Sequence, residues 1–167
     1  FHDPVHGIPI FSLYGEVRKP TPAMMDEFDV LLVDLQDLGC RIYTFITTLR
    51  YVLEAAASHG KSVWILDRPN PIGRPIEGLR LREGWESFVG AGPLPMRHGL
   101  TLGELAHWFV RTLKLNVDYR VIEMEGWQPR QAPGLGWPLG ERTWVNPSPN
   151  APNLWMARCY AGTVMLE

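Results

Sequence analysis

Several features that would assign a function class directly are missing from this sequence. It has two cysteines among 167 residues, Cys40 and Cys159, which are too few for a disulfide framework or a cysteine-based zinc site. No apolar run approaches the roughly 20 residues that a membrane-spanning helix needs. Neither sign of charge dominates, because 16 basic residues stand against 18 acidic ones. The sequence therefore gives no electrostatic indication of nucleic acid or an anionic membrane as a partner.

The motifs of the common nucleotide-dependent and hydrolytic enzymes are missing as well. The chain has no G-x-x-x-x-G-K phosphate loop, no G-x-G-x-x-G turn and no G-x-S-x-G nucleophile elbow. No close set of histidine, cysteine and aspartate has zinc-binding spacing. We therefore predict a protein that uses neither a cofactor nor a metal.

What is present is the pattern of a globular α/β protein, with 46% hydrophobic residues. Residues 29–36 form a continuous apolar strand, which is typical of a sheet that is covered on both faces. Residues 42–58 follow a helical period that Gly60 ends, and residues 62–67 form the next strand. This succession predicts a β-α-β unit with a right-handed crossover.

Further elements are expected on both sides of this unit. Residues 8–15 read as a strand, and residues 18–28 as a turn and a short helix with Thr21 as its cap and Pro22 at its first position. The chain begins without an initiator methionine, and it stops after a strand-like stretch, TVMLE. We expect both ends to continue in a longer protein.

The clearest local signal in the chain is a T-x-x-E capping box formed by Thr101 and Glu104. It predicts a helix that runs to about residue 113, followed by a strand at 119–125. Residues 126–153 are rich in glycine, proline and tryptophan and are too long for a simple connection. Loops of this length in compact domains are usually functional.

Polar side chains follow both central strands, at the point where each strand ends. Since ligands bind at the carboxyl ends of parallel strands, these side chains indicate one shared site. They could hydrogen-bond a polyhydroxylated ligand or stabilise a cation-like transition state. A structural ion pair with Arg41, a capping carboxylate or a proline-bounded tight turn would explain them equally well. The residues are Asp34, Gln36, Asp37, Arg41 and Tyr43 after the first strand, and Asp67, Arg68 and Asn70 after the second.

Arg97 and His98 come just before the helix that begins at Thr101. The amino end of a helix attracts anions, and a guanidinium group fits a carboxylate or a phosphate. His98 can equally be a structural hydrogen-bonding residue.

A rigid N-P-S-P-N loop presents Asn146, Ser148 and Asn150, with Trp144 and Trp155 on either side of it. A sugar ring could rest on the face of either tryptophan. The alternative is a structural proline turn.

Four segments, in this order, resemble the DUF1343 family: DLQDLGCRIYTFITT, LDRPNPIG, SFVGAGPLPMRHGLTLGELA and WVNPSPNAP. The characterised members of that family are exo-β-N-acetylmuramidases of the NamZ type. The resemblance covers essentially the whole chain. It implies a Rossmann-like, mostly parallel sheet with flanking helices over residues 1–115, and the start of a smaller C-terminal α+β region over residues 116–167. The site would lie in the cleft between the two domains.

The resemblance also implies an activity and a location. The enzyme would be a glycoside hydrolase that releases terminal N-acetylmuramic acid from the non-reducing end of peptidoglycan fragments. A peptidoglycan-derived muramic acid saccharide would be its partner, and it would be secreted or periplasmic. Family members carry a P-E-H-G motif upstream of the position of Phe1, and its glutamate is a candidate general acid.

Muramic acid differs from other hexosamines by a lactyl carboxylate, and Arg68 or Arg97 could bind it. Asp34 or Asp37 would be the internal catalytic carboxylate. The remaining candidates would hold hydroxyl and acetamido groups: Gln36, Arg41, Tyr43, Asp67, Asn70, His98, Asn146, Ser148 and Asn150. Two other hypotheses stay open. The chain could bind sugar without turnover, or it could be a metal-dependent phosphohydrolase that uses Asp34, Asp37 and Asp67.

Overall fold

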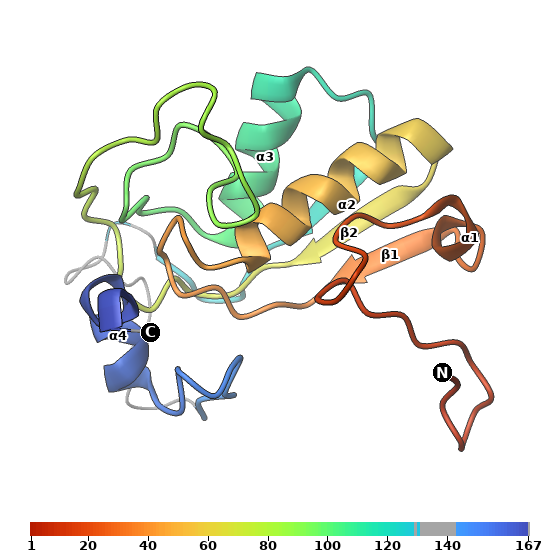
Figure 1. The fold of residues 1–167 in the computed structure, drawn as a ribbon, viewed down its shortest axis with the longest axis horizontal. Helices are drawn as coiled ribbons and strands as arrows, with labels where there is room; N and C mark the ends of the chain where they lie inside the picture. Colours follow the sequence, from red (N-terminus) through yellow and green to blue (C-terminus); the bar gives the residue numbers. More distant parts are fainter. Residues whose placement is uncertain (129, 131–142, 167) are drawn as a thin grey trace.

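The computed structural model describes residues 1–128, 130 and 143–166 (Figure 1). Within these residues a three-stranded parallel sheet has the order β1 (Val30–Val33), β2 (Ser62–Leu66) and β3 (Tyr119–Ile122). Helices α2 (Phe45–His59) and α3 (Leu102–Leu113) connect successive strands. The predicted α/β class and the predicted β-α-β unit are confirmed.

Helix α2 packs an apolar face onto the sheet because its apolar residues recur at helical spacing. Ile46, Leu49 and Leu53 are fully buried on this face, together with Val63 and Ile65 of β2. The helix ends at Gly60, whose φ of +64° is the left-handed conformation that glycine adopts without steric cost. The sequence predicted this end of the helix correctly.

Helix α3 begins at the predicted capping box. The Thr101 hydroxyl accepts the Glu104 N–H at 3.3 Å, and the Glu104 carboxylate accepts the Thr101 N–H at 2.9 Å. The short helix α1 (Pro22–Met25) is likewise capped by Thr21. The predicted first residues of both helices are confirmed. The sequence alone could predict them because each cap joins residues within four positions of one another.

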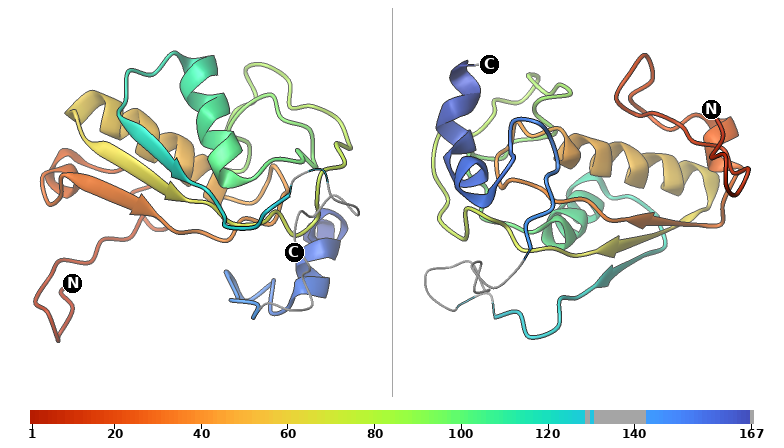
Figure 2. Two further views of the ribbon diagram at one scale, coloured as in Figure 1. Left: turned by 180° about the vertical axis from the view of Figure 1, so that it is seen from behind. Right: turned by 90° about the horizontal axis from the view of Figure 1, so that it is seen from below.

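The sheet is covered on one face only by the described residues, so the prediction of two covered faces is wrong for them. Both long helices lie on the same side of the sheet (Figure 2). Two crossovers of the same hand that step in the same direction, as the order β1-β2-β3 requires, place their helices on one face. On the other face Val30, Leu32 and Ile122 are 40%, 55% and 44% exposed.

Two strand predictions at the ends of the chain are wrong. Residues 8–15 contain no strand, and only an isolated bridge joins His2 to Pro9. The described residues of the TVMLE stretch are helical: Thr163 ends helix α4 (Leu154–Thr163), and the 3-10 turn η2 (Val164–Leu166) follows it. The strand expected at 119–125 is present in shortened form as β3 and lies in the sheet beyond residue 115.

Helix α4 lies beyond the carboxyl ends of the strands (Figure 1). Its Ala157 and Tyr160 are buried in a second apolar cluster with Leu38, Cys40 and Tyr43 from the segment that follows β1. This cluster holds the C-terminal helix at the edge of the sheet where ligands bind in open α/β folds.

Candidate functional site

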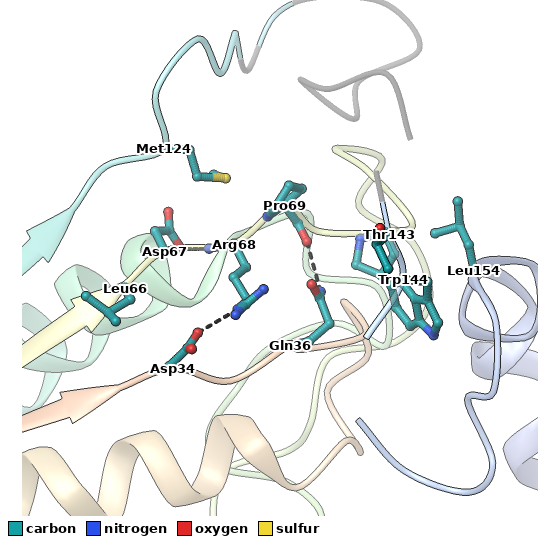
Figure 3. A pocket seen from close by; sticks show the side chains of 11 residues that line it. Asp34, Gln36, Leu66, Asp67, Arg68, Pro69, Met124, Thr143, Trp144 and Leu154 are labelled. Carbon is teal, nitrogen blue, oxygen red and sulfur yellow. Dashed lines mark hydrogen bonds and ion pairs between the residues drawn. The ribbon is translucent and has the colours of Figure 1, made fainter. Parts of the chain in front are cut away.

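A cavity of about 330 Å³ opens at the carboxyl ends of the strands, where the polar residues were predicted to meet (Figure 3). Its volume is within the range of about 300–1,000 Å³ that small-molecule pockets occupy. The cavity brings together four of the predicted site residues. The lining residues are Asp34 and Gln36 after β1, Leu66, Asp67, Arg68, Pro69 and Pro71 at the end of β2, Met124 after β3, and Thr143, Trp144 and Leu154.

Asp34 and Arg68 form an ion pair that links the ends of β1 and β2. Arg68 Nε lies 2.6 Å from Asp34 Oδ1. The hydrogen bond from Arg68 holds the pKa of Asp34 below its usual value, and Asp34 raises the pKa of Arg68 in return. Both side chains are partly exposed, so solvent screens the pair. The terminal guanidinium nitrogens of Arg68 have no partner among the described residues and can bind an anion in the cavity.

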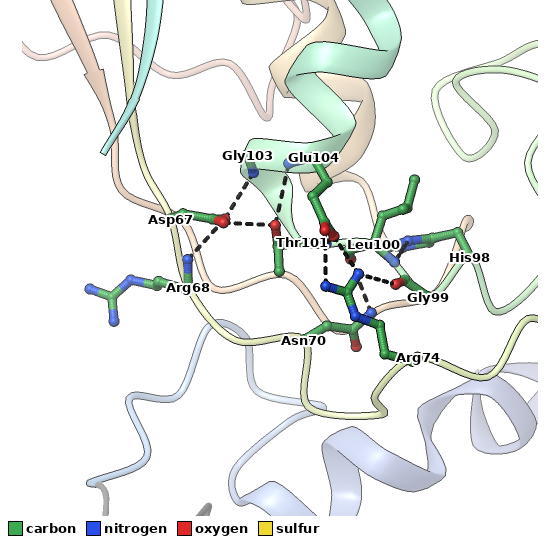
Figure 4. A network of polar contacts seen from close by, with 10 residues as sticks. All are labelled: Asp67, Arg68, Asn70, Arg74, His98, Gly99, Leu100, Thr101, Gly103 and Glu104. Carbon is green, nitrogen blue, oxygen red and sulfur yellow. Dashed lines mark hydrogen bonds and ion pairs between the residues drawn. The ribbon is translucent and has the colours of Figure 1, made fainter. Parts of the chain in front are cut away.

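Asp67 is the most heavily hydrogen-bonded carboxylate of the site (Figure 4). It accepts the Thr101 hydroxyl at 2.7 Å, the Gly103 N–H at 2.8 Å and the Arg68 N–H at 3.1 Å. Burial raises the pKa of Asp67, although the three donors oppose the shift. The carboxylate therefore joins the end of β2 to the start of α3.

Two further residues fasten the same loop to the start of α3. The Asn70 amide donates to the Leu100 carbonyl at 3.0 Å. The Arg74 guanidinium binds both carboxylate oxygens of Glu104, at 2.7 and 2.9 Å. Together with Asp67, these contacts tie the segment 67–74 to the segment 99–104 (Figure 4).

Asp37 and His98 form a separate, buried pair. Asp37 Oδ2 accepts the Gly39 N–H at 2.7 Å and lies 3.5 Å from His98 Nε2. His98 Nδ1 accepts the Leu100 N–H at 3.1 Å, so the proton of the neutral ring is on Nε2, facing Asp37. Neither side chain lines the cavity.

Arg41 and Arg97 are turned toward the main chain instead of the cavity. Arg41 donates to two carbonyl groups at 2.8 Å each. Arg97 donates to a third carbonyl at 2.6 Å and pairs with the Glu77 carboxylate. Arg97 therefore does not share the first cavity with Asp34 and Asp67.

Three other candidates lie at a second cavity, of about 350 Å³, which is lined by Tyr43, Ser148 and Asn150 among other residues. Asn146 accepts the Ser148 N–H at 3.1 Å and so stabilises the turn. The predicted site residues are thus divided between the two cavities, the buried Asp37–His98 pair, and side chains that stabilise the surrounding loops.

Sequence reasoning missed the apolar members of the first cavity, Leu66, Met124 and Leu154. No polar signal marks them, and Leu154 belongs to a helix that was not predicted. Trp144, which the sequence analysis singled out, lines this cavity.

The described part of the chain contains no group of three histidine, cysteine, aspartate or glutamate residues that could hold a metal ion. Asp34, Asp37 and Asp67 have separate partners, so their geometry does not support the phosphohydrolase hypothesis. None of the described helices is both long and apolar enough to span a bilayer.

Comparison with known proteins gives three kinds of match. The family model described as "Exo-beta-N-acetylmuramidase NamZ, N-terminal" matches residues 1–155. The chain is 40% identical over 162 residues to the peptidoglycan beta-N-acetylmuramidase NamZ of Bacillus subtilis (strain 168). The aligned residues cover 96% of this chain and 38% of that protein.

Two solved structures of DUF1343 family proteins from Bacteroides fragilis NCTC 9343 are also similar. One has a TM-score of 0.88 at 39% identity, and the match covers 99% of this chain and 43% of the chain in that structure. The other has a TM-score of 0.80 at 35% identity, and the match covers 98% of this chain and 44% of the chain in that structure. The chain spans less than half the length of each of these relatives.

Proposed function

The chain belongs to the exo-beta-N-acetylmuramidase NamZ N-terminal family, and from this premise we propose that it supplies the sugar-binding cavity of a glycoside hydrolase that releases terminal N-acetylmuramic acid from peptidoglycan fragments. One observation carries the proposal. A single cavity at the strand ends combines a guanidinium group with available donors, a carboxylate and a tryptophan, namely Arg68, Asp34 and Trp144.

Each of these groups suits one part of the proposed substrate. The lactyl carboxylate of muramic acid fits the terminal nitrogens of Arg68. The apolar face of the sugar ring fits the indole of Trp144, whose N–H is already donated to the Ala151 carbonyl at 2.9 Å. The Gln36 side-chain amide donates to the Pro69 carbonyl at 3.1 Å, and Gln36 lines the cavity.

Glycoside hydrolysis requires a carboxylate that stabilises positive charge at the reacting carbon. We assign this part to Asp34 rather than to Asp37, because Asp34 lines the cavity and the hydrogen bond from Arg68 keeps its pKa low and the group ionised. Asp67 is occupied by three donors, so in the proposal it positions Arg68 and does not react.

The experiment compares Arg68→Gln with the matched control Arg97→Gln. The affinity of each variant for N-acetylmuramic acid and for N-acetylglucosamine would be measured by calorimetry, beside hydrolysis of the corresponding chromogenic β-glycosides. We expect Arg68→Gln to weaken muramic acid binding by about 10- to 150-fold, the effect of a lost charge-assisted hydrogen bond of roughly 1.5–3 kcal/mol. Glucosamine binding should not change. Equal losses on both sugars, or an equal effect of Arg97→Gln, would refute the role of Arg68.

A second function, sugar binding without turnover, is favoured by the state of the two cavity carboxylates. Asp34 is already paired with Arg68, and Asp67 already accepts three hydrogen bonds. Binding of muramic acid without release of product from the glycoside would decide for this alternative.

The proposal also implies where the protein acts. Because its substrate is a cell-wall fragment, we expect a secreted or periplasmic protein. Cell fractionation followed by detection of the protein in the cytoplasm alone would contradict this expectation.

A further inference from the structure

A third cavity, of about 360 Å³, lies where helices α2 and α3 meet the long loop that joins β2 to α3. It shares no lining residue with the two cavities described above, so the proposed function leaves it unused. Its volume is again within the range of small-molecule pockets. The lining residues are Arg50 of α2, Trp108, Phe109, Thr112 and Leu113 of α3, and Glu83, Glu86, Ala91, Gly92 and Pro93 of the loop.

The loop wall of the third cavity is fixed to α2 without a ligand. Arg50 Nη1 donates to the Ala91 carbonyl at 2.6 Å, and Arg50 Nε donates to the Glu54 carboxylate at 2.8 Å. The Phe88 ring of the loop stacks on the Tyr51 ring of α2, with 6.4 Å between the centroids. The loop lies beside both helices (Figure 1). The cavity is therefore formed in advance, as binding sites usually are.

One side of the third cavity is apolar and can be reached by a ligand. The Trp108 and Leu113 side chains are partly buried, and Pro93 is exposed. Gly92 lets the indole come close to the loop, since a Cβ at this glycine would lie 2.9 Å from a Trp108 ring atom. A small apolar side chain can lose part of its contact with water against these surfaces.

The remaining lining residues have charges of both signs, and these charges do not pair with each other. Arg50 is 24% exposed, and its second terminal nitrogen, Nη2, has no hydrogen-bond partner in the described part of the chain. Glu83 and Glu86 are exposed, and the Gly84 N–H orients the Glu86 carboxylate at 2.9 Å. Within the described residues, Arg50 forms its ion pair with Glu54 and not with Glu83 or Glu86.

Each charge favours a different group of a ligand. A guanidinium nitrogen without a partner fits a carboxylate, and two neighbouring glutamates attract an ammonium group. A ligand that carried only one of these groups would leave the charge on the other wall without a partner. The cavity therefore suits a molecule with both groups and an apolar part between or beside them.

We propose that the third cavity binds a small zwitterion with an apolar side chain, namely an amino acid or a dipeptide with free amino and carboxyl ends. The carboxylate binds Arg50 Nη2, the ammonium group faces Glu83 and Glu86, and the side chain packs on Trp108. This site is independent of the proposed sugar site, because the two cavities have no lining residue in common.

The test is calorimetry on the 167-residue chain with L-leucine and L-leucyl-L-leucine. Each probe is compared with its N-acetylated form, which lacks the ammonium group, and with its amide form, which lacks the carboxylate. We expect one ligand to bind per chain, and each blocked form to bind about three- to tenfold more weakly than the free form, the effect of one partly exposed charged contact. The length of the probe that binds more tightly distinguishes an amino acid from a dipeptide.

Variants show whether these preferences arise in the third cavity. Arg50→Gln should abolish the preference for the free form over the amide. The double change Glu83→Gln with Glu86→Gln should abolish the preference for the free form over the acetylated one. Arg111→Gln and Glu16→Gln are matched controls, because both side chains are exposed and do not line this cavity. If Arg50→Gln fails to fold, the glutamate variant, whose altered side chains are exposed, decides alone.

A second readout gives the place of binding. The indole N–H signal of Trp108 in an ¹⁵N spectrum should move when the probe is added, and that of Trp144 in the first cavity should not. Absence of saturable binding by both probes, preferences that survive in the variants, or a shift of Trp144 alone would overturn the proposal. None of these results would affect the proposed muramidase function, which is tested with Arg68→Gln.

Discussion

The hydroxyl of Thr101 holds together the start of α3 and the carboxylate at the end of β2, and removing it is the sharpest test of how the site is built. The side chain is only 3% exposed. Its oxygen accepts the Glu104 N–H at 3.3 Å and donates to Asp67 Oδ2 at 2.7 Å. Thr101→Ala removes both hydrogen bonds, whereas Thr101→Ser retains the oxygen and loses only a methyl group.

The expected cost can be worked out from these two contacts. Loss of an N-cap hydrogen bond costs about 0.5–2 kcal/mol. Leaving the partly buried Asp67 carboxylate without one of its three donors adds roughly 1–3 kcal/mol. We therefore expect Thr101→Ala to lower the free energy of unfolding by about 2–4 kcal/mol. Thr101→Ser should cost about 0.8 kcal/mol, the value of one buried methylene-sized group.

Urea unfolding of the wild type and both variants measures these differences as changes in the midpoint at constant slope. Carboxyl NMR provides an independent readout, since the hydrogen bond from Thr101 lowers the pKa of Asp67 and its loss should raise that pKa further. If the two variants unfold within about 0.5 kcal/mol of each other, the hydroxyl does not couple helix and carboxylate, and the reasoning is refuted.

Three other predictions follow from the described contacts. Burial raises the pKa of Asp67, so the folded chain binds a proton at this carboxylate more tightly than the unfolded chain does. The stabilisation that results is fully present below the ordinary pKa of 3.8 and falls as pH rises through the folded pKa. Asp67→Asn should remove this pH dependence from a series of urea titrations. Cys40 is fully buried and burial raises its pKa to about 12, so iodoacetamide should modify only the exposed Cys159 in the folded chain, and two adducts by mass spectrometry would contradict this. Gly39→Ala should destabilise the fold by about 3 kcal/mol or more, because a Cβ at this left-handed residue would overlap two neighbouring side chains. Gly60→Ala places its Cβ in open space and should cost only about 1–2 kcal/mol. Equal decreases in the melting temperature of the two variants would contradict this prediction.

The elements that the sequence predicted correctly are those with local signals. Thr101 and Glu104 are three positions apart, so the capping box could be recognised without knowledge of the fold. Gly60 marks the end of α2 for the same reason. The joining of Asp34, Asp67 and Arg68 at one edge of the sheet follows from the rule that the carboxyl ends of parallel strands lie together.

The errors concern contacts between distant segments. Residues 8–15 have the composition of a strand, but a strand requires a partner and the described structure offers only one isolated bridge there. Arg97 is near the start of α3 in sequence, yet its guanidinium pairs with the Glu77 carboxylate. The two residues lie together because an isolated antiparallel bridge joins their backbones, although 20 positions separate them in the sequence. No pattern within either segment indicates that pairing.

The three contacts that fasten the segment 67–74 to the start of α3 also determine how Arg68 meets a ligand. Asp67, Asn70 and Arg74 each bind the same short stretch, so the backbone that carries Arg68 cannot move unless the first turn of α3 moves with it. A ligand that binds Arg68 therefore has little backbone conformational entropy to remove from this segment. Main-chain amides of this segment should accordingly be among the slowest to exchange with deuterium outside the central sheet, both before and after a sugar is bound.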